Sequence, residues 1–81
     1  MQSDEIIRAV VDDSGMSMYA ASLAMGRSKL YIAQAVYAKR IPTVRTLAAL
    51  CDVTDHDLIV RNRKTGREIT IDPPERESDE D

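Results

Sequence analysis

The residues with the clearest chemical potential lie in a stretch without acidic side chains. No Asp or Glu occurs between Asp13 and Asp52. Within this stretch Gln34 can hydrogen-bond an adenine edge at two atoms, and Lys29 can donate to guanine. Basic side chains without carboxylates beside them are suited to contact phosphate groups. The pattern therefore favours contact with a nucleic acid, and the basic residues of the stretch are Arg27, Lys29, Lys39, Arg40 and Arg45.

The charge of the chain is segregated along its length. The formal net charge of −3 by itself argues mildly against nucleic-acid binding, because Lys and Arg supply most of the non-specific affinity for phosphates. Residues 14–51, however, contain five basic and no acidic residues, whereas residues 72–81 contain six acidic residues and Arg76. The two segments must therefore be interpreted separately, and the acidic end is expected to keep the protein soluble.

Length and composition exclude several classes of protein. A chain of 81 residues is long enough for one domain with a small core. Cys51 is the only cysteine, so we expect neither an internal disulfide nor a zinc site, and we expect Cys51 in the core. Residues 1–14 mix acidic and basic residues into their apolar pattern, which does not predict a signal peptide, and there is no run of about 18 apolar residues that would predict a membrane span. We therefore expect a cytoplasmic protein that is not an enzyme and has no cofactor, metal or small-molecule ligand.

Four short helices must position the candidate side chains. Each is preceded by a Ser or Thr that can cap it, while Gly15 and Gly26 end the first two and Pro42 prevents the third from continuing. Apolar residues recur within each segment at a spacing that gives one buried face, so the helices are expected to share one core. The predicted N-caps are Ser3, Ser17, Ser28 and Thr43, and the third and fourth helices end near Ala38 and Asp52.

A change of period after Asp55 predicts a β-hairpin. One face is expected to be formed by Leu58, Val60, Ile69 and Ile71, which alternate with Ile59, Arg61, Glu68 and Thr70 around a turn at 63–66. An isolated two-stranded ribbon is marginal in water, so it should pack on the helices or pair with a second copy. The expected organisation is a helical domain at 1–55, an appended hairpin at 56–72 and a disordered acidic tail at 73–81.

The second and third helices have the pattern of a helix-turn-helix. Such a motif needs a small residue at a tight reversal, and Gly26 supplies it. Met25, Ile32 and Ala35 are spaced so that they can join the two helices. The opposite side of the third helix then faces outward, and it consists of Leu30, Ala33, Gln34 and Tyr37.

Several stretches, taken in order, resemble the phage-repressor and Cro-like (Xre-type) helix-turn-helix family. They are AMGRS at 24–28, IA at 32–33, AKRIPT at 38–43 and TLAAL at 46–50, and the resemblance covers about residues 17–53. Arg27, Val36 and Ala38 depart from the residues usual at those positions, which are an aliphatic residue, Glu and Gly. The resemblance implies a mainly α, lambda-repressor-like fold of four to five short helices, followed here by the hairpin.

The resemblance also implies that the third helix enters the major groove of double-stranded DNA. Basic side chains and a helix N-terminus near the groove would then hold phosphates without reading sequence. The candidate base-contacting residues are Ser28, Lys29, Leu30, Ala33, Gln34 and Tyr37, and the candidate phosphate-binding residues are Ser17, Arg27, Lys39, Arg40 and Thr43.

Two functions remain open at this point. The first is a prokaryotic, homodimeric and sequence-specific transcriptional regulator, in particular a repressor of phage, mobile-element or toxin-antitoxin type. The second is a protein-interaction module, such as an antitoxin or inhibitor, because an exposed stripe with Leu30 and Tyr37 is also typical of a contact with another protein. The hairpin is a candidate dimer interface through its apolar face, and its basic residues are an alternative source of phosphate contacts.

Overall fold

The computed structural model describes residues 1–74, which form four α-helices, a short 3-10 segment and one antiparallel hairpin. This architecture confirms the predicted fold class, a small helical protein with a C-terminal β-hairpin. The expectation of a disordered acidic tail at 73–81 falls largely on residues 75–81, outside those that the structure describes. The elements are η1 (Ser3–Glu5), α1 (Ile6–Ser14), α2 (Met18–Ala24), α3 (Tyr31–Tyr37), α4 (Val44–Val53), β1 (Leu58–Arg61) and β2 (Glu68–Ile71).

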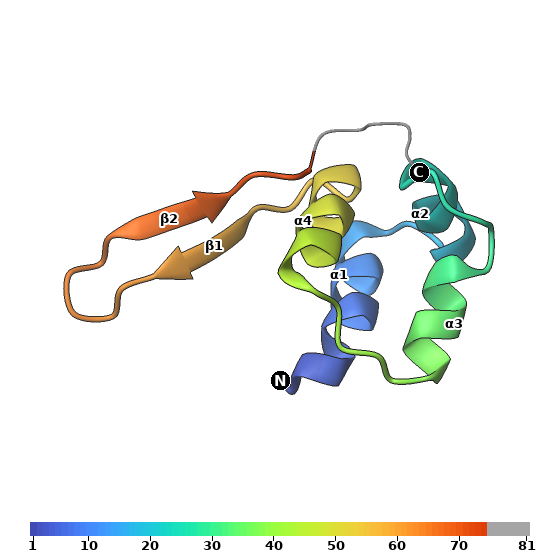
Figure 1. The fold of residues 1–81 in the computed structure, drawn as a ribbon, viewed down its shortest axis with the longest axis horizontal. Helices are drawn as coiled ribbons and strands as arrows, with labels where there is room; N and C mark the ends of the chain where they lie inside the picture. Colours follow the sequence, from blue (N-terminus) through green and yellow to red (C-terminus); the bar gives the residue numbers. More distant parts are fainter. Residues whose placement is uncertain (75–81) are drawn as a thin grey trace.

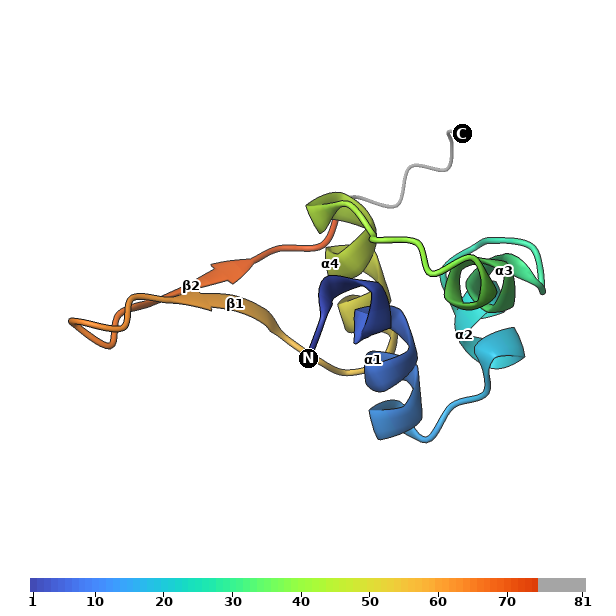
Figure 2. The ribbon, with the colours of Figure 1, turned by 90° about the horizontal axis from the view of Figure 1, so that it is seen from below.

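The four helices form one body from which the hairpin projects as an arm (Figure 1). In this body α2 packs on α3, and both contact other helices: α3 lies against α1, and α2 lies against α4. The perpendicular view shows the same separation, with the hairpin at one end of the molecule and α3 at the other (Figure 2). The longest dimension is 41 Å.

The core is small and aliphatic. Ile7 and Val11 lie one turn apart on α1 and are both buried, and Ile32 and Ala35 bury the corresponding face of α3. Leu50 of α4 completes the contact between these helices. Side chains three or four residues apart share a helix face, so the sequence period predicts which side chains of each helix are buried.

The first helix begins differently from the sequence expectation. Ser3 does not cap α1, because residues 3–5 form the 3-10 turn η1 with Gln2 as its N-cap. The Gln2 backbone N–H donates to Glu5 Oε1 at 3.3 Å, and α1 follows from Ile6 to Ser14. Gly15 then ends α1 as expected, with a left-handed φ of 79°.

His56 fixes the junction between α4 and the hairpin. Its backbone N–H donates to the Cys51 carbonyl, which closes the end of α4. Its ring Nδ1 lies 3.0 Å from Thr54 Oγ1, and its Nε2 lies 2.8 Å from Asp13 Oδ2. Since Asp13 belongs to α1, these contacts connect the base of the hairpin to a second helix.

The hairpin pairs Leu58 with Ile71 and Val60 with Ile69, as the alternation predicts. Only its base lies against the helices, through contacts between β1 and α4. Leu58 and Ile71 are half-buried there, whereas Val60 and Ile69 are 58% and 55% exposed. The arm therefore presents aliphatic side chains to solvent along its outer half.

Within residues 1–74, no helix combines the length and the apolar character that crossing a bilayer requires.

The pH dependence of stability tests whether the Cys51 thiol is buried in the core. Burial raises the pKa of its thiol above the ordinary value of 9.0, and the charge of Asp57 raises it further. The folded protein therefore retains the thiol proton more strongly than the unfolded chain does. This contribution to stability is fully present below the thiol pKa of the unfolded chain and is lost as pH rises through the higher folded pKa.

We expect the free energy of unfolding to decline more steeply above pH 9 for the wild-type protein than for Cys51→Ala, which lacks the thiol. Urea unfolding of both proteins between pH 7 and strongly alkaline pH measures the difference. If the free energy of unfolding had the same pH dependence in both proteins, the conclusion that the thiol is buried would be wrong.

Candidate nucleic-acid interface

The chain reverses direction between α2 and α3 at Gly26. Gly26 has a left-handed φ of 76°, which a residue without a Cβ adopts at little cost. The Gly26 N–H donates to the Leu23 carbonyl at 2.9 Å, and the Arg27 N–H donates to the Ser22 carbonyl at 3.0 Å. These two bonds form a Schellman motif, which satisfies the last carbonyls of α2 while the chain turns towards α3.

A buried hydroxyl joins the two helices. Ser22 is 0% exposed, and its Oγ donates to the Met18 carbonyl at 2.7 Å and accepts from the Ile32 N–H at 3.0 Å. Ile32 is the second residue of α3, so its N–H has no carbonyl partner within that helix. Ser22 thus performs for α3, from the neighbouring helix, the role that an N-cap side chain usually performs.

The expectation that Ser28 caps the third helix is wrong. The helix begins at Tyr31, its N-cap is Leu30, and no side chain of that residue bonds the helix. Ser28 instead accepts the Tyr31 N–H through its backbone carbonyl at 3.1 Å, as part of a turn. The cap is unnecessary at Ser28 because Ser22 already satisfies a free N–H of the first turn. Ser28, Lys29 and Leu30 consequently lie ahead of α3 and not on it.

The outward side of α3 nevertheless agrees with the sequence pattern. Gln34 is exposed, Tyr37 is 77% exposed, and Leu30 at the N-cap is 53% exposed, whereas Ala33 is half-buried. The side chains of Ile32 and Ala35 point the other way into the core. A continuous exposed surface of one amide, one aromatic ring and one aliphatic side chain therefore extends along α3, with Ser28 and Lys29 exposed just before it.

Basic residues flank this surface at both ends of α3. At its start, the Arg27 guanidinium lies 4.9 Å from the centre of the Tyr31 ring, a cation–π distance that limits where this charge can move. At its end, Lys39 and Arg40 are exposed in the connection to α4. Within residues 1–74, the close contacts between basic and acidic side chains are Arg8–Asp12 and His56–Asp13. In this part of the chain, then, no carboxylate neutralises the cations around α3.

The predicted phosphate ligands Ser17 and Thr43 have structural roles of their own. Each is the N-cap of a helix: Ser17 Oγ accepts the Ala20 N–H at 3.0 Å, and Thr43 Oγ1 accepts the Thr46 N–H at 3.1 Å. The Thr43 hydroxyl also donates to Thr46 Oγ1 at 3.1 Å. A phosphate at the start of α4 would therefore meet the backbone N–H groups of the first turn more readily than the Thr43 hydroxyl.

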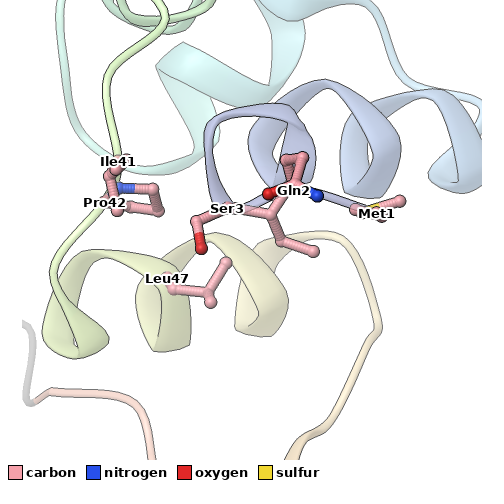
Figure 3. A pocket seen from close by; sticks show the side chains of 7 residues that line it. Met1, Gln2, Ser3, Ile41, Pro42 and Leu47 are labelled. Atoms are coloured by element: carbon pink, nitrogen blue, oxygen red, sulfur yellow. The ribbon is translucent and has the colours of Figure 1, made fainter.

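An open hollow of about 310 Å³ lies apart from the α3 surface (Figure 3). The chain's first residues form one side of it, the connection from α3 to α4 forms another, and α4 contributes Leu47. Its lining has no charged side chain, and residues 1–74 hold no group of three metal-ligating side chains. The hollow therefore offers mainly apolar contact with two neutral polar side chains, and it is lined by Met1, Gln2, Ser3, Ile6, Ile41, Pro42 and Leu47.

Comparison of the chain with models of known protein families, with curated proteins and with solved structures gives no match.

The buried hydroxyl leads to a stability prediction. We expect Ser22→Ala to lower the free energy of unfolding by about 1–3 kcal/mol, because it leaves the buried Ile32 N–H without an acceptor. Urea unfolding measures the loss, and amide hydrogen exchange should show faster exchange at Ile32. Ser28→Ala is the matched control, since that side chain is exposed, and should change stability by less than about 0.5 kcal/mol. Equal effects of the two substitutions would refute the proposed role of Ser22.

Lys39 follows the end of α3, and its backbone is in the left-handed conformation, with φ of 54°. The Arg40 N–H donates to the Ala35 carbonyl at 3.0 Å, so the α3 end is a Schellman motif without glycine. We expect Lys39→Gly to raise the free energy of unfolding by about 0.5–1 kcal/mol, because glycine relieves the left-handed strain. Lys39→Ala removes the same charge and retains the strain, so thermal unfolding should show no comparable gain.

Proposed function

We propose that this protein is a sequence-specific DNA-binding regulator of transcription that acts as a repressor in the cytoplasm of a prokaryotic cell. The observation that supports this function best is the exposed surface of α3 between cations that no carboxylate of residues 1–74 neutralises. The resemblance of residues 17–53 to phage-repressor and Cro-like proteins also supports it. The proposal assigns no catalytic step and no small-molecule ligand to the protein.

Base recognition in this proposal falls mainly to Gln34. Its side chain is exposed on α3, and a Gln amide can donate to and accept from one adenine in the major groove. Lys29 can donate to guanine, and Leu30 can contact a thymine methyl group. Both residues lie in the turn before α3, so they approach the groove from the N-terminal end of the helix. This is the end that helix-turn-helix proteins direct at base edges.

Phosphate binding in this proposal falls to Arg27, Lys39 and Arg40. All three are exposed and lie at the two ends of α3, where the backbone on either side of a groove would pass. Such contacts supply affinity and register without sequence preference, and base contacts then select the site. A protein held in this way over a promoter would exclude polymerase, which is the simplest route to repression.

A second candidate function is binding to another protein through the same surface, as an antitoxin or inhibitor. The specific observation in its favour is the exposure of Leu30 and Tyr37 at 53% and 77%, which leaves apolar and aromatic area in solvent. The two functions differ in salt dependence. DNA binding releases counterions and weakens steeply with salt, whereas an apolar protein contact does not.

The groove assignment predicts the behaviour of Gln34→Ala. We expect it to reduce affinity for the preferred site by about 1–3 kcal/mol and to relax preference at one base position, because one bidentate contact is lost. Fluorescence anisotropy with the DNA upstream of the gene, and with variants at each position, measures both effects.

Lys39→Ala is the matched control for this experiment. It should weaken binding to specific and scrambled duplexes alike and reduce the slope of log affinity against log salt by about 1. Unchanged base preference in Gln34→Ala would refute the groove assignment. The absence of any DNA binding by the folded protein at low salt would instead favour a protein partner.

A further inference from the structure

The arm leaves backbone hydrogen-bonding groups unpaired along both of its edges. Bonded and non-bonded residue pairs alternate along an antiparallel ladder. The Asn62 N–H donates to the Arg67 carbonyl at 2.8 Å, so the bonded pairs are Val60–Ile69 and Leu58–Ile71. The backbone N–H and C=O groups of the residues between them therefore point away from the partner strand.

On the β1 edge the outward-pointing groups belong to Ile59, Arg61 and, by the same alternation, Asp57. No helix covers this edge in either view of the molecule (Figures 1 and 2). Exposed edges of this kind are templates for pairing with another strand. Because β1 is short, the side chains that flank it decide which strand fits.

We propose that a second copy of this chain pairs with β1 along this edge, antiparallel, with Ile59 on the two-fold axis. In this register Ile59 faces Ile59 of the second copy as a hydrogen-bonded pair. Asp57 faces Arg61 of the second copy twice, by symmetry, and both side chains are exposed. Leu58 faces Val60 of the second copy, so aliphatic residues also lie opposite one another.

The β2 edge does not allow the same arrangement. Its outward-pointing groups belong to Glu68 and Thr70. A two-fold pairing about Thr70 would place Glu68 opposite Asp72 of the second copy, twice, and like charges directly opposite are destabilising. Pairing of β1 with β2 of another copy has no two-fold symmetry and would continue into a ring or an open chain of molecules. Charge and symmetry therefore select the β1 edge.

Pairing through β1 also brings the exposed aliphatic residues of the two arms together. It converts a two-stranded ribbon, which is marginal in water, into a four-stranded sheet. Because the two-fold axis is perpendicular to the sheet, Val60 and Ile69 of both copies lie on one face and form a continuous apolar surface. The inference does not depend on DNA binding, since it uses no residue of the α3 surface.

Charge reversal across the arm tests this register. Sedimentation equilibrium should find wild-type protein as a dimer, and Asp57→Lys should weaken the dimer about tenfold or more, because a Lys then faces Arg61 of the second copy. Thr70→Lys is the matched control. Thr70 lies opposite Ile59 on the other edge of the same hairpin, so the introduced Lys is away from the proposed interface and dimerisation should be unaffected. A monomer at every concentration, or equal effects of the two substitutions, would overturn the inference.

Cross-linking tests the axis directly. Hydrogen-bonded antiparallel pairs have Cα atoms about 5.5 Å apart, a separation that a disulfide spans. Ile59→Cys in a Cys51→Ala background should form a disulfide-linked dimer with diamide as oxidant. Thr70→Cys in the same background, opposite Ile59 on the β2 edge, should not. Equal cross-linking of both variants, or none of Ile59→Cys in a folded protein, would overturn the register. Neither result depends on whether the protein binds DNA.

Discussion

The arrangement of the helices depends on one buried hydroxyl. Ser22 accepts a hydrogen bond from the first turn of α3 and donates one to α2, so it sets the position of one helix on the other. The protein interior cannot replace such bonds with water, which makes each of them costly to lose. A core of aliphatic side chains would permit the two helices to slide by small amounts. The hydroxyl restricts them to one register, and the exposed surface of α3 is fixed as a result.

The second constraint is the way the helices end. α2 and α3 both end in Schellman motifs, but only α2 has glycine at the left-handed position, and α3 uses Lys39. A lysine there strains the backbone, and glycine would relieve that strain without a charge. The chain keeps a cation at the point where α3 ends and the connection to α4 begins. Local strain retained beside a candidate binding surface is consistent with selection for that surface over stability.

Sequence patterns predicted the elements well and the contacts between elements poorly. The apolar period placed Ile32 and Ala35 in the core, and the alternation after Asp55 predicted the hairpin with Leu58, Val60, Ile69 and Ile71 on one face. Ser28 was assigned as a cap because capping rules consider only residues adjacent in sequence. The serine that satisfies α3 lies ten residues before Ile32, and its only sequence signal was a polar residue in an otherwise apolar helix. The projection of the hairpin also depends on tertiary contacts, such as His56 with Asp13, that no local pattern encodes.

The placement of α3 and the arm at opposite ends of the molecule has an evolutionary consequence (Figure 2). Gln34 and Tyr37 are exposed, so exchanging them requires no rearrangement of the core. Substitution of these residues would also leave the strand edges of the hairpin unchanged, because the hairpin lies at the far end of the molecule. In the proposed arrangement, target preference would diverge between descendants of this chain through substitutions on one helix face, while folding and pairing through the arm would be inherited unchanged. Two coexisting paralogues would then acquire different targets and still exchange subunits, unless the arm diverged as well.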